Sequence, residues 1–336
     1  MKSTALISVI MAARNAEPFI EETIYGILNQ THQNLELIIV NDCSTDQTEQ
    51  RILSIKDERI KYLSNSTHLG PGRSRNIGLQ HAKGDFITIT DSDDISVPER
   101  LALQLNFLQK NPEIDLVSGG MQYFGSADKN IVTFPQSPEF IHCWLLFNNC
   151  LPNIVFYRRE LVDNKSFKYN DFWFGEDYYL WYELIKKGYR FSTLPDVLIQ
   201  CRVHENRITT TNLEKRTQDI YSRFAQRIYD TFGIEIPPEN FGTITTFIHT
   251  RLAVDNEKFA VIKHFLEQLY MENKRQKIYD QTFFSAVLYF YFLRLGKYFF
   301  IEQGKPLQFA KYFSALVYML GLKSLIIFLR NNKGYR

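Results

Sequence analysis

The chain has 336 residues, of which 45% are hydrophobic and 23% charged, so it can bury a sizeable core and is not globally disordered. This length predicts one large domain, or one domain with an appendage. The formal net charge of +2 lacks the strongly basic balance of a general nucleic-acid binder, and we expect no nucleic-acid partner.

Strand and helix signals alternate from the start of the chain to about residue 200. Apolar stretches of strand length lie at 6–12, 35–40, 60–63 and 86–90. Helices are expected over 18–30, in a segment ending near 55, and after a loop at 70–78 in a segment ending near 84. This alternation predicts an α/β fold, with a mostly parallel sheet and helices on both of its faces.

The opening stretch, 1–13, alternates apolar and polar residues and is rich in β-branched side chains, which favours a first strand over a signal peptide. The cysteines show no C-x-x-C spacing and no disulfide framework, which is typical of a reducing compartment. These four residues are Cys43, Cys143, Cys150 and Cys201.

Two acidic turns, Asn41–Asp46 and Asp91–Asp94, come directly after predicted strands. Ligands of parallel sheets bind outside the carboxyl ends of the strands, so we expect both turns at one edge. The second turn holds three carboxylates in four residues, and their repulsion is costly unless a cation or hydrogen-bond donors offset it. Mg²⁺ and Mn²⁺ take carboxylate and phosphate oxygens, so this turn predicts a metal–phosphate site.

The turn after the first strand, Ala12–Glu17, contains no glycine. This excludes a G-x-G-x-x-G dinucleotide fold and a P-loop, and it disfavours a sugar-nucleotide pyrophosphorylase or other nucleotidyltransferase. A second acidic site, Glu176–Asp177, precedes a stretch of helical spacing. A nucleotidyltransferase and a non-catalytic sugar-nucleotide-binding protein remain as alternatives, although two acidic sites argue for catalysis.

Beyond about Asn212 the sequence predicts helices, at 216–232, 241–253, 257–271 and 281–300. No uninterrupted span of ~18 apolar residues is present, so we expect no transmembrane helix. The stretches 283–300 and 313–329 are rich in aromatic residues, and residues 303–336 hold six basic and no acidic residues. Two interpretations stay open: packing of a helical module, or an interfacial anchor on an anionic membrane.

Five segments resemble, in order, the motifs of bacterial-type family 2 glycosyltransferases of the GT-A fold. They are Ser8–Glu17, Leu37–Asp46, Gly70–Gly78, Asp91–Asp94 and Gly175–Trp181. The resemblance implies a GT-A catalytic domain over 1–211, with a Rossmann-like, mostly parallel sheet, and a helical C-terminal region over 212–336. It also implies that a sugar is transferred, with inversion, from a nucleoside-diphosphate sugar to a hydroxyl of a saccharide or lipid-linked saccharide. A UDP-sugar is the first candidate for the donor. The setting would be the cytoplasm, at the inner face of the membrane.

The resemblance implies a set of residues that bind the donor nucleotide. They are Ala12, Arg14, Asp42, Arg73, Arg75, Asp91 and Ser92. In the family an aspartate at the place of Asp42 accepts from a base N–H, although Asp is also a common turn former. Arg73 and Arg75 suit diphosphate oxygens at the start of a helix, with a solvated surface position as the alternative for each.

By the same resemblance, Asp93 and His204 would be ligands of Mn²⁺ or Mg²⁺, which neutralises the leaving diphosphate. Asp91 would reach the ribose or a metal-bound water. Asp94 has a plainer alternative as a cap of the turn that follows it, where Pro98 opens a helix expected from Glu99.

Asp177 matches the family's general base, with Glu176 beside it. Neighbouring charge and partial burial should raise the pKa of this base. The alternative is that both residues only favour a helix N-terminus. Asn153, in a segment that resembles the family's acceptor side, and Trp173 are candidate acceptor contacts, whereas Trp181 is expected in the core.

Overall fold

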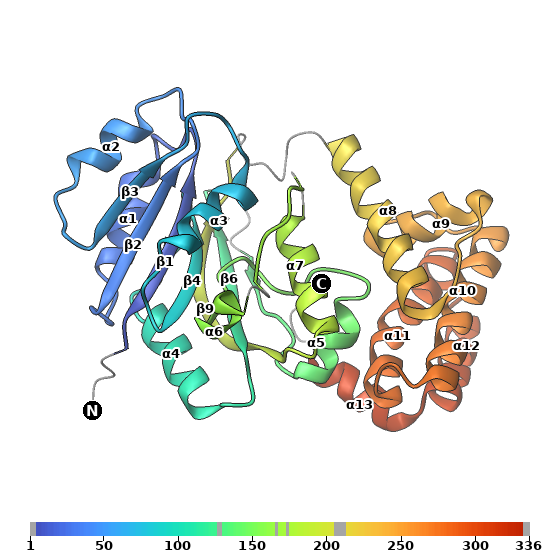
Figure 1. Cartoon of the computed structure of the whole chain (residues 1–336). Helices are drawn as coiled ribbons and strands as arrows, with labels where there is room; N and C mark the ends of the chain where they lie inside the picture. Colours follow the sequence, from blue (N-terminus) through green and yellow to red (C-terminus); the bar gives the residue numbers. More distant parts are fainter. Residues whose placement is uncertain (1–4, 126–129, 165–166, 173–174, 205–212, 332–336) are drawn as a thin grey trace. The chain divides into compact units, whose positions relative to one another are not determined.

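The computed structural model describes residues 5–125, 130–164, 167–172, 175–204 and 213–331. Contacts divide the chain into two compact units (Figure 1). Unit 1 comprises Met1–Gln136 and Leu151–Thr211, and unit 2 comprises Ser137–Cys150 and Asn212–Lys333. Unit 2 therefore includes a segment that lies well before residue 211 in the sequence.

Unit 1 is built on one sheet, nine-stranded over the described residues, with the order β3-β2-β1-β4-β8-β6-β9-β5 and with β7 paired to β6. The strands are β1 (Ile7–Ala13), β2 (Leu35–Asn41), β3 (Ile60–Ser64), β4 (Phe86–Asp91), β5 (Ile95–Ser96), β6 (Leu116–Phe124), β7 (Ile131–Val132), β8 (Phe156–Arg158) and β9 (Phe191–Arg202). The first four strands are parallel. Beyond β4 the sheet is mixed, because β8 runs antiparallel to both of its neighbours. The α/β fold is confirmed: the N-terminal half of the sheet is wholly parallel, whereas the second half combines the parallel pair β6 and β9 with the antiparallel strands β5, β7 and β8.

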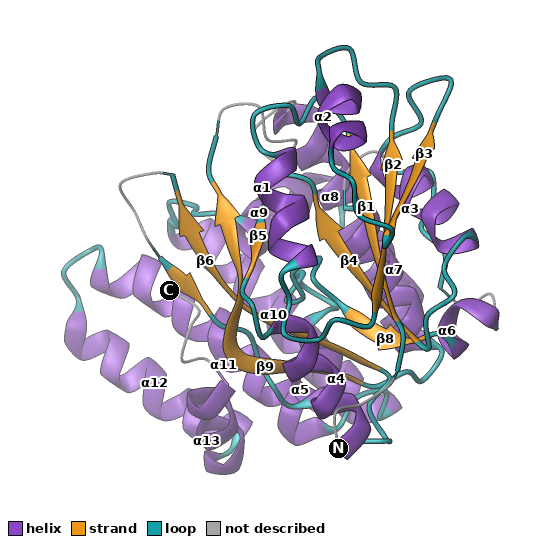
Figure 2. Ribbon diagram, turned by 90° about the vertical axis from the view of Figure 1, so that its left-hand side faces the viewer, coloured by secondary structure: helices purple, strands orange, loops and turns teal. Residues whose placement is uncertain are grey.

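Helices cover both faces of this sheet (Figure 2). They are α1 (Ile20–Leu28), α2 (Thr48–Ser54), α3 (Pro71–Gln80), α4 (Arg100–Lys110), α6 (Glu160–Asp163) and α7 (Glu176–Lys186). The odd-numbered residues of β1 share a buried cluster with apolar residues of α1 and α4. On the opposite face, α3 approaches β1 so closely that a Cβ on Gly78 would lie 2.5 Å from Ile10 Cγ2. Only glycine allows this approach.

The segment 70–78, expected as a loop, is instead mostly the helix α3, which begins at Pro71. Proline at the first helical position has a suitable φ and lacks only an N–H that would have no helical partner. Gly70 precedes it with φ of +89°, in the region that favours glycine. The Gly-Pro pair thus starts the helix directly, and Arg73 and Arg75 lie on its first two turns.

Unit 2 is helical, with α5 (Pro138–Trp144), α8 (Leu213–Phe232), α9 (Pro238–His249), α10 (Asn256–Gln276), α11 (Gln281–Gly296), the π-helical turn η2 (Lys297–Ile301), α12 (Pro306–Leu320) and α13 (Leu322–Asn331). The helix α11 is central, because it contacts α5, α10, α12 and α13. Its aromatic residues, among them Phe284, Tyr289 and Phe292, are buried. For the stretch 283–300, packing within the unit is therefore the better of the two interpretations.

Within the described residues, one helix, Gln281–Ile301, is long and apolar enough to cross a membrane. A second apolar stretch is the pair α12 and α13, which is bent by 105° at Gly321. Most of the first helix is buried within the fold, as is usual for the core helix of a helical domain. Length and composition alone therefore do not make it a membrane span.

Candidate active site

The two acidic turns meet at one edge of the sheet, as the sequence predicted. In the strand register, Ala13 of β1 lies opposite Asn41 of β2, and Ala12 lies opposite Asp91 of β4. The amide of Asp42 donates to the carbonyl of Ala13 at 2.8 Å. Because these three neighbouring strands are parallel, their carboxyl ends place both turns beside the start of β1's own loop.

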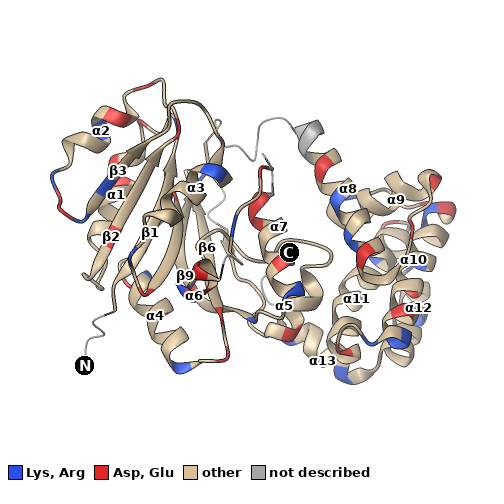
Figure 3. Ribbon diagram, viewed as in Figure 1, with Lys and Arg blue, Asp and Glu red and all other residues tan. Residues whose placement is uncertain are grey.

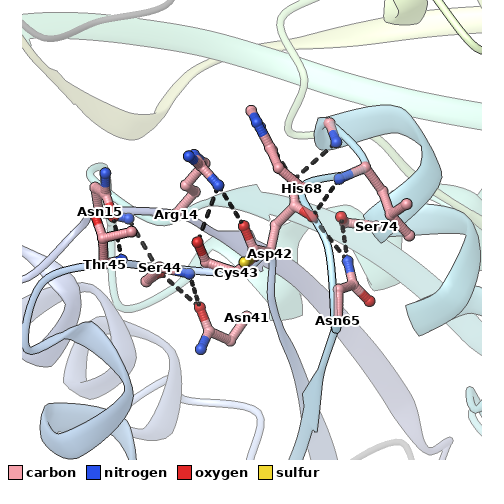
Figure 4. A network of polar contacts seen from close by, with 12 residues as sticks. Arg14, Asn15, Asn41, Asp42, Cys43, Ser44, Thr45, Asn65, His68 and Ser74 are labelled. Carbon is pink, nitrogen blue, oxygen red and sulfur yellow. Dashed lines mark hydrogen bonds and ion pairs between the residues drawn. The ribbon is translucent and has the colours of Figure 1, made fainter.

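The carboxylate of Asp42 is buried and holds the loop that leads into α3 (Figure 4). Its Oδ1 accepts from the amide of Leu69 at 2.8 Å and from Asn65 Nδ2 at 2.9 Å. Its Oδ2 accepts from the amide of Gly70 at 2.8 Å and lies 3.5 Å from His68 Nε2. A carboxylate offers about four lone-pair sites, so these donors occupy most of its capacity. Contact between Asp42 and a donor base remains a prediction.

The turn that carries Asp42 is stabilised from β1. Arg14 Nη1 donates to the carbonyls of Asp42 and Cys43, at 2.9 and 3.0 Å. Cys43 has φ of +57°, a left-handed conformation, at a position where the resembling family usually has glycine. Ser44 Oγ donates to Asn41 Oδ1 at 2.6 Å, which closes the turn (Figure 4). Asn41 and Cys43 thus both serve the geometry of this turn.

Arg75 connects the two acidic sites of the sequence. Its Nη2 donates to Asp91 Oδ1 at 2.8 Å, and its Nη1 donates to Glu176 Oε1 at 2.6 Å. The guanidinium is buried and also lies over the ring of Tyr169, 5.4 Å from the centroid. Burial lowers the pKa of Arg75, but the charges of Asp91 and Glu176 outweigh it and raise that pKa overall. Both Nη atoms are therefore engaged by carboxylates of the chain, and contact with a diphosphate remains a prediction.

Arg73, two residues earlier on α3, is in a different environment. Its Nε and Nη2 pair with the two oxygens of Asp171, each at 2.7 Å. Both partners are exposed, as the surface alternative expected. Its role toward a donor also remains a prediction.

Asp93 and His204, the two proposed metal ligands, lie together. Asp93 Oδ2 is 2.9 Å from His204 Nε2, and the ring of Phe19 packs beside the imidazole with 4.7 Å between centroids. Among the described residues, no group of three or more His, Cys, Asp or Glu side chains is placed to hold a metal ion. One oxygen and one nitrogen ligand fit a divalent ion such as Mn²⁺ that takes its remaining ligands from phosphates and water.

Asp94 is not the N-cap of the helix that follows it. The helix α4 begins at Arg100, and its N-cap Glu99 makes no side-chain cap bond. Asp94 Oδ1 instead accepts from the amide of Arg202 on β9 at 2.9 Å, which joins the acidic turn to the strand that precedes His204. Burial raises the pKa of Asp94 to about 7, with the charges of Asp93 and Asp91 adding to the shift. Ser92, the remaining residue of this turn, accepts at its carbonyl from Thr23 Oγ1 at 3.2 Å.

The acidic pair 176–177 opens α7, behind Gly175 in a left-handed conformation. Glu176 is buried against Arg75, and Asp177 Oδ1 accepts from the amide of Tyr178 at 2.6 Å. Burial and the neighbouring charge of Glu176 together raise the pKa of Asp177 to about 7. This is the direction expected for a general base.

The candidate acceptor residues have different outcomes. Asn153 Nδ2 donates to Asp91 Oδ1 at 3.4 Å, and Asn153 Oδ1 accepts from Tyr169 at 3.3 Å, so this residue belongs to the same network. Trp173 lies outside the described residues. Trp181 is fully buried, which confirms its expected place in the core.

Sequence reasoning missed Tyr169, Asn65 and His68. His68 is partly exposed and lies beside Asp42, with its Nε2 3.5 Å from Asp42 Oδ2. Tyr169 closes the network around Arg75 and is fully buried. None of the three lies in a motif, and only the contacts of the fold identify them.

Comparison with known proteins places the chain among glycosyltransferases. The family model described as "Glycosyl transferase family 2" matches residues 8–166 of the chain. A protein of Haemophilus influenzae, described as an uncharacterized glycosyltransferase, is 30% identical over 297 residues, which are 81% of this chain and 87% of that protein. The Escherichia coli protein WfgD, a UDP-Glc:alpha-D-GlcNAc-diphosphoundecaprenol beta-1,3-glucosyltransferase, is 36% identical over 54% of this chain and 70% of its own length. WfaP of the same species carries the same description and is 33% identical over 62% of this chain and 82% of its own length.

Among solved structures, TarS 1–349 of S. aureus in complex with UDP-GlcNAc superimposes with a TM-score of 0.56. It is 20% identical and covers 87% of this chain and 89% of its own. At this identity the likeness concerns the fold, and it confirms the GT-A fold expected from the sequence.

Proposed function

The chain belongs to glycosyl transferase family 2 and is a glycosyltransferase, and on that premise we propose that it moves a hexosyl or N-acetylhexosaminyl group from a nucleoside-diphosphate sugar to an acceptor hydroxyl, with inversion. The first candidate donor is a UDP-sugar, and the acceptor is a saccharide or a lipid-linked saccharide. In support, WfgD and WfaP are described with UDP-Glc and a diphosphoundecaprenol-linked GlcNAc, and TarS was solved with UDP-GlcNAc.

The observation that carries this proposal is the buried ion pair of Arg75 with Asp91 and Glu176. One guanidinium joins the strand end that would face the donor to the helix start that holds the candidate base. Donor and acceptor sites on opposite sides of the same buried group allow a single displacement between them.

In the proposed step, Asp177 accepts the proton of the acceptor hydroxyl while that oxygen forms a bond to the anomeric carbon. The bond from this carbon to the phosphate oxygen breaks, and the leaving nucleoside diphosphate keeps the electron pair. Attack from the face opposite the leaving group inverts the anomeric centre, and no second protein nucleophile is needed. A pKa of about 7 lets Asp177 be partly ionised at neutral pH and still basic enough to accept a proton.

The leaving diphosphate would lie on the side of Asp91 and Asp93. Asp93 and His204 would hold Mn²⁺ or Mg²⁺, whose charge supplies electrostatic stabilisation to the departing diphosphate. Ala12, Arg14, Asp42 and Ser92 surround the edge where the nucleotide would bind.

The acceptors named for WfgD and WfaP favour a role in polysaccharide assembly on a lipid carrier, in the cytoplasm at the inner face of the membrane. Screening a panel of nucleotide sugars for hydrolysis in the presence of Mn²⁺ identifies the donor. Release of a nucleoside diphosphate is the expected result, whereas release of pyrophosphate from a nucleoside triphosphate and a sugar 1-phosphate, in a parallel assay, would contradict the reaction. The anomeric configuration of the transferred sugar, read by NMR, tests the inversion.

Two substitutions separate the roles within the site. Asp93→Ala and Asp177→Asn should each abolish transfer, and only Asp93→Ala should weaken metal-dependent donor binding, measured by calorimetry. Asp163→Asn, on the exposed part of α6, is the matched control and should leave both properties unchanged. Equal donor binding by the two site variants would refute this division of roles.

A further inference from the structure

The helices α12 and α13 expose apolar side chains to solvent. Tyr318 is 95% exposed, Leu307 81% and Leu322 62%, and Ile326 and Leu329 are exposed as well. Large apolar residues with such high exposure, gathered on two consecutive helices, are unusual on a protein surface that contacts solvent alone. Such a patch is typical of an interaction surface.

These residues lie on one face of each helix. On α12 the exposed positions 307, 311, 314, 315 and 318 follow helical spacing, and 306, 308 and 310 near its start are exposed as well. On α13 the exposed positions 322, 323, 326, 329 and 330 follow the same spacing. The residues that alternate with them, Leu316 and Leu320 on α12 and Ser324 and Phe328 on α13, are buried in the unit. Each helix therefore packs on one side and presents a second, exposed apolar face.

The charges of this exposed face are all of one sign. Lys311 lies on the exposed face of α12, Lys323 and Arg330 lie on the exposed face of α13, and no acidic residue occurs from 303 to 336. We call the ten positions 307, 311, 314, 315, 318, 322, 323, 326, 329 and 330 the α12–α13 surface. Basic charge interleaved with leucine, isoleucine and tyrosine is the composition of helices that lie in a membrane interface.

The helix α10 of the same unit shows what an ordinary solvent face looks like here. It pairs Lys263 with Glu267 and Arg275 with Glu272, so both signs of charge alternate along it. The distribution of charged residues over the helices of unit 2 can be followed in Figure 3. The single sign of charge on the α12–α13 surface is therefore local and not a property of the whole unit.

We propose that the α12–α13 surface docks the enzyme on an anionic lipid bilayer. The apolar side chains enter the boundary between headgroups and acyl chains, and Lys311, Lys323 and Arg330 remain at the level of the anionic headgroups. The bend of 105° at Gly321, which has φ of +86°, divides the surface into two short segments. Neither segment reaches the ~20 residues that a span requires. Interfacial docking, and not crossing, is the mode that fits.

A second copy of this chain is the main competing occupant. In a symmetric dimer through this surface the same patch would face itself. The three basic residues would then meet the three of the partner with no acid on this surface to offset them. An anionic bilayer removes this repulsion, so the charge pattern favours lipid.

The test is co-sedimentation of the full chain with vesicles of phosphatidylcholine alone or mixed with phosphatidylglycerol. Wild type should bind the mixed vesicles, and binding should weaken with salt. Replacing Lys311, Lys323 and Arg330 with glutamine should weaken this binding by roughly fivefold per charge, or roughly a hundredfold together. Replacing Tyr318, Leu322 and Leu329 with serine should abolish it on both kinds of vesicle.

The matched controls are Met271→Ser and Lys274→Gln, an exposed apolar and an exposed basic residue on α10. Both should bind vesicles as wild type does, and all variants should keep the wild-type circular dichroism and the activity on a soluble acceptor. Failure of wild type to bind, equal binding to neutral and anionic vesicles, or an equal loss in the α10 controls would each overturn the proposal. So would a concentration-dependent dimer that the serine variant alone disrupts, without vesicle binding.

Discussion

Replacing Arg75 with methionine tests the central ion pair of the active site. Methionine has a similar length and apolar stem but leaves the carboxylate of Glu176 buried without its cation. Breaking a buried pair costs about 3–5 kcal/mol. The side chain of Asp91 is 41% exposed and can be solvated, so only the pair with Glu176 counts fully, and we expect the lower end of this range, about 3 kcal/mol.

Urea unfolding measures this cost, and Arg73→Met is the control, because the same residue type lies two positions earlier on the same helix. Its pair with Asp171 is exposed, and exposed pairs contribute about 0–1 kcal/mol. Arg75→Lys keeps the charge but cannot contact Asp91 and Glu176 with two separate nitrogens as arginine does. It should therefore lose less stability than Arg75→Met. If Arg75→Met cost no more than Arg73→Met, the structural role given to this ion pair would be wrong.

The same substitution has a second, catalytic readout. The charge of Arg75 holds down the pKa of Asp177, which burial and Glu176 raise. Without that charge the base ionises at a higher pH, so the acidic limb of kcat/KM should move to higher pH. Adding Glu176→Gln to Arg75→Met removes the unpaired carboxylate and should recover part of the stability and reverse part of the pH shift. A pH profile that does not move would contradict the coupling between the two acidic sites.

Three further outcomes follow from the same contacts. Because the pKa of Asp177 in the folded chain, about 7, lies above that of a free carboxyl, the fold is most favoured where this group is protonated and loses stability as pH rises from about 4 to 7. The stability of Asp177→Asn over wild type, from urea unfolding, should therefore grow between about pH 5 and about pH 8, by on the order of 2 kcal/mol, and a constant difference would contradict the raised pKa. His204→Ala should weaken Mn²⁺-dependent binding of a nucleoside diphosphate in calorimetry, but less than Asp93→Ala, and an unchanged affinity would remove His204 from the metal shell. Gly78→Ala should destabilise the fold by about 1–3 kcal/mol in thermal unfolding, since its Cβ would meet Ile10, whereas Gly242→Ala, with open space around it, should cost nothing.

The sequence predicts the half of the sheet whose strands are long and periodic. The four parallel strands and the first two helices between them were expected within a few residues, because apolar runs of that length are a strong signal, whereas α3 lies largely where a loop was expected. The strands β5 and β7 have two residues each and β8 has three, which is too short to leave a periodic pattern. Their antiparallel pairing is set by the rest of the sheet, so the mixed second half could not be read from the sequence.

The sequence also places the acidic motifs at strand and helix ends, but not the contacts between them. Arg75 and Glu176 are 101 residues apart, and Asp94 and Arg202 are 108 apart. Motif matching assigned Arg75 a ligand outside the chain, a diphosphate, because local sequence cannot show an internal partner so distant. The structure supplies that partner, and a charged side chain engaged in this way orients the site whether or not it also touches the donor.

For the C-terminal helices, hydropathy likewise does not show which side of each helix is buried. The stretches 283–300 and 313–329 are similarly apolar and aromatic, and composition alone left both open to core packing and to membrane contact. The fold separates them, because α11 is surrounded by four helices whereas α12 and α13 are covered on one side only. Hydropathy counts apolar residues without regard to the side on which they lie, and membrane docking depends on that side. The three basic residues favour lipid contact only because they lie on the exposed apolar side, since the same charges would be ordinary on a face of mixed sign.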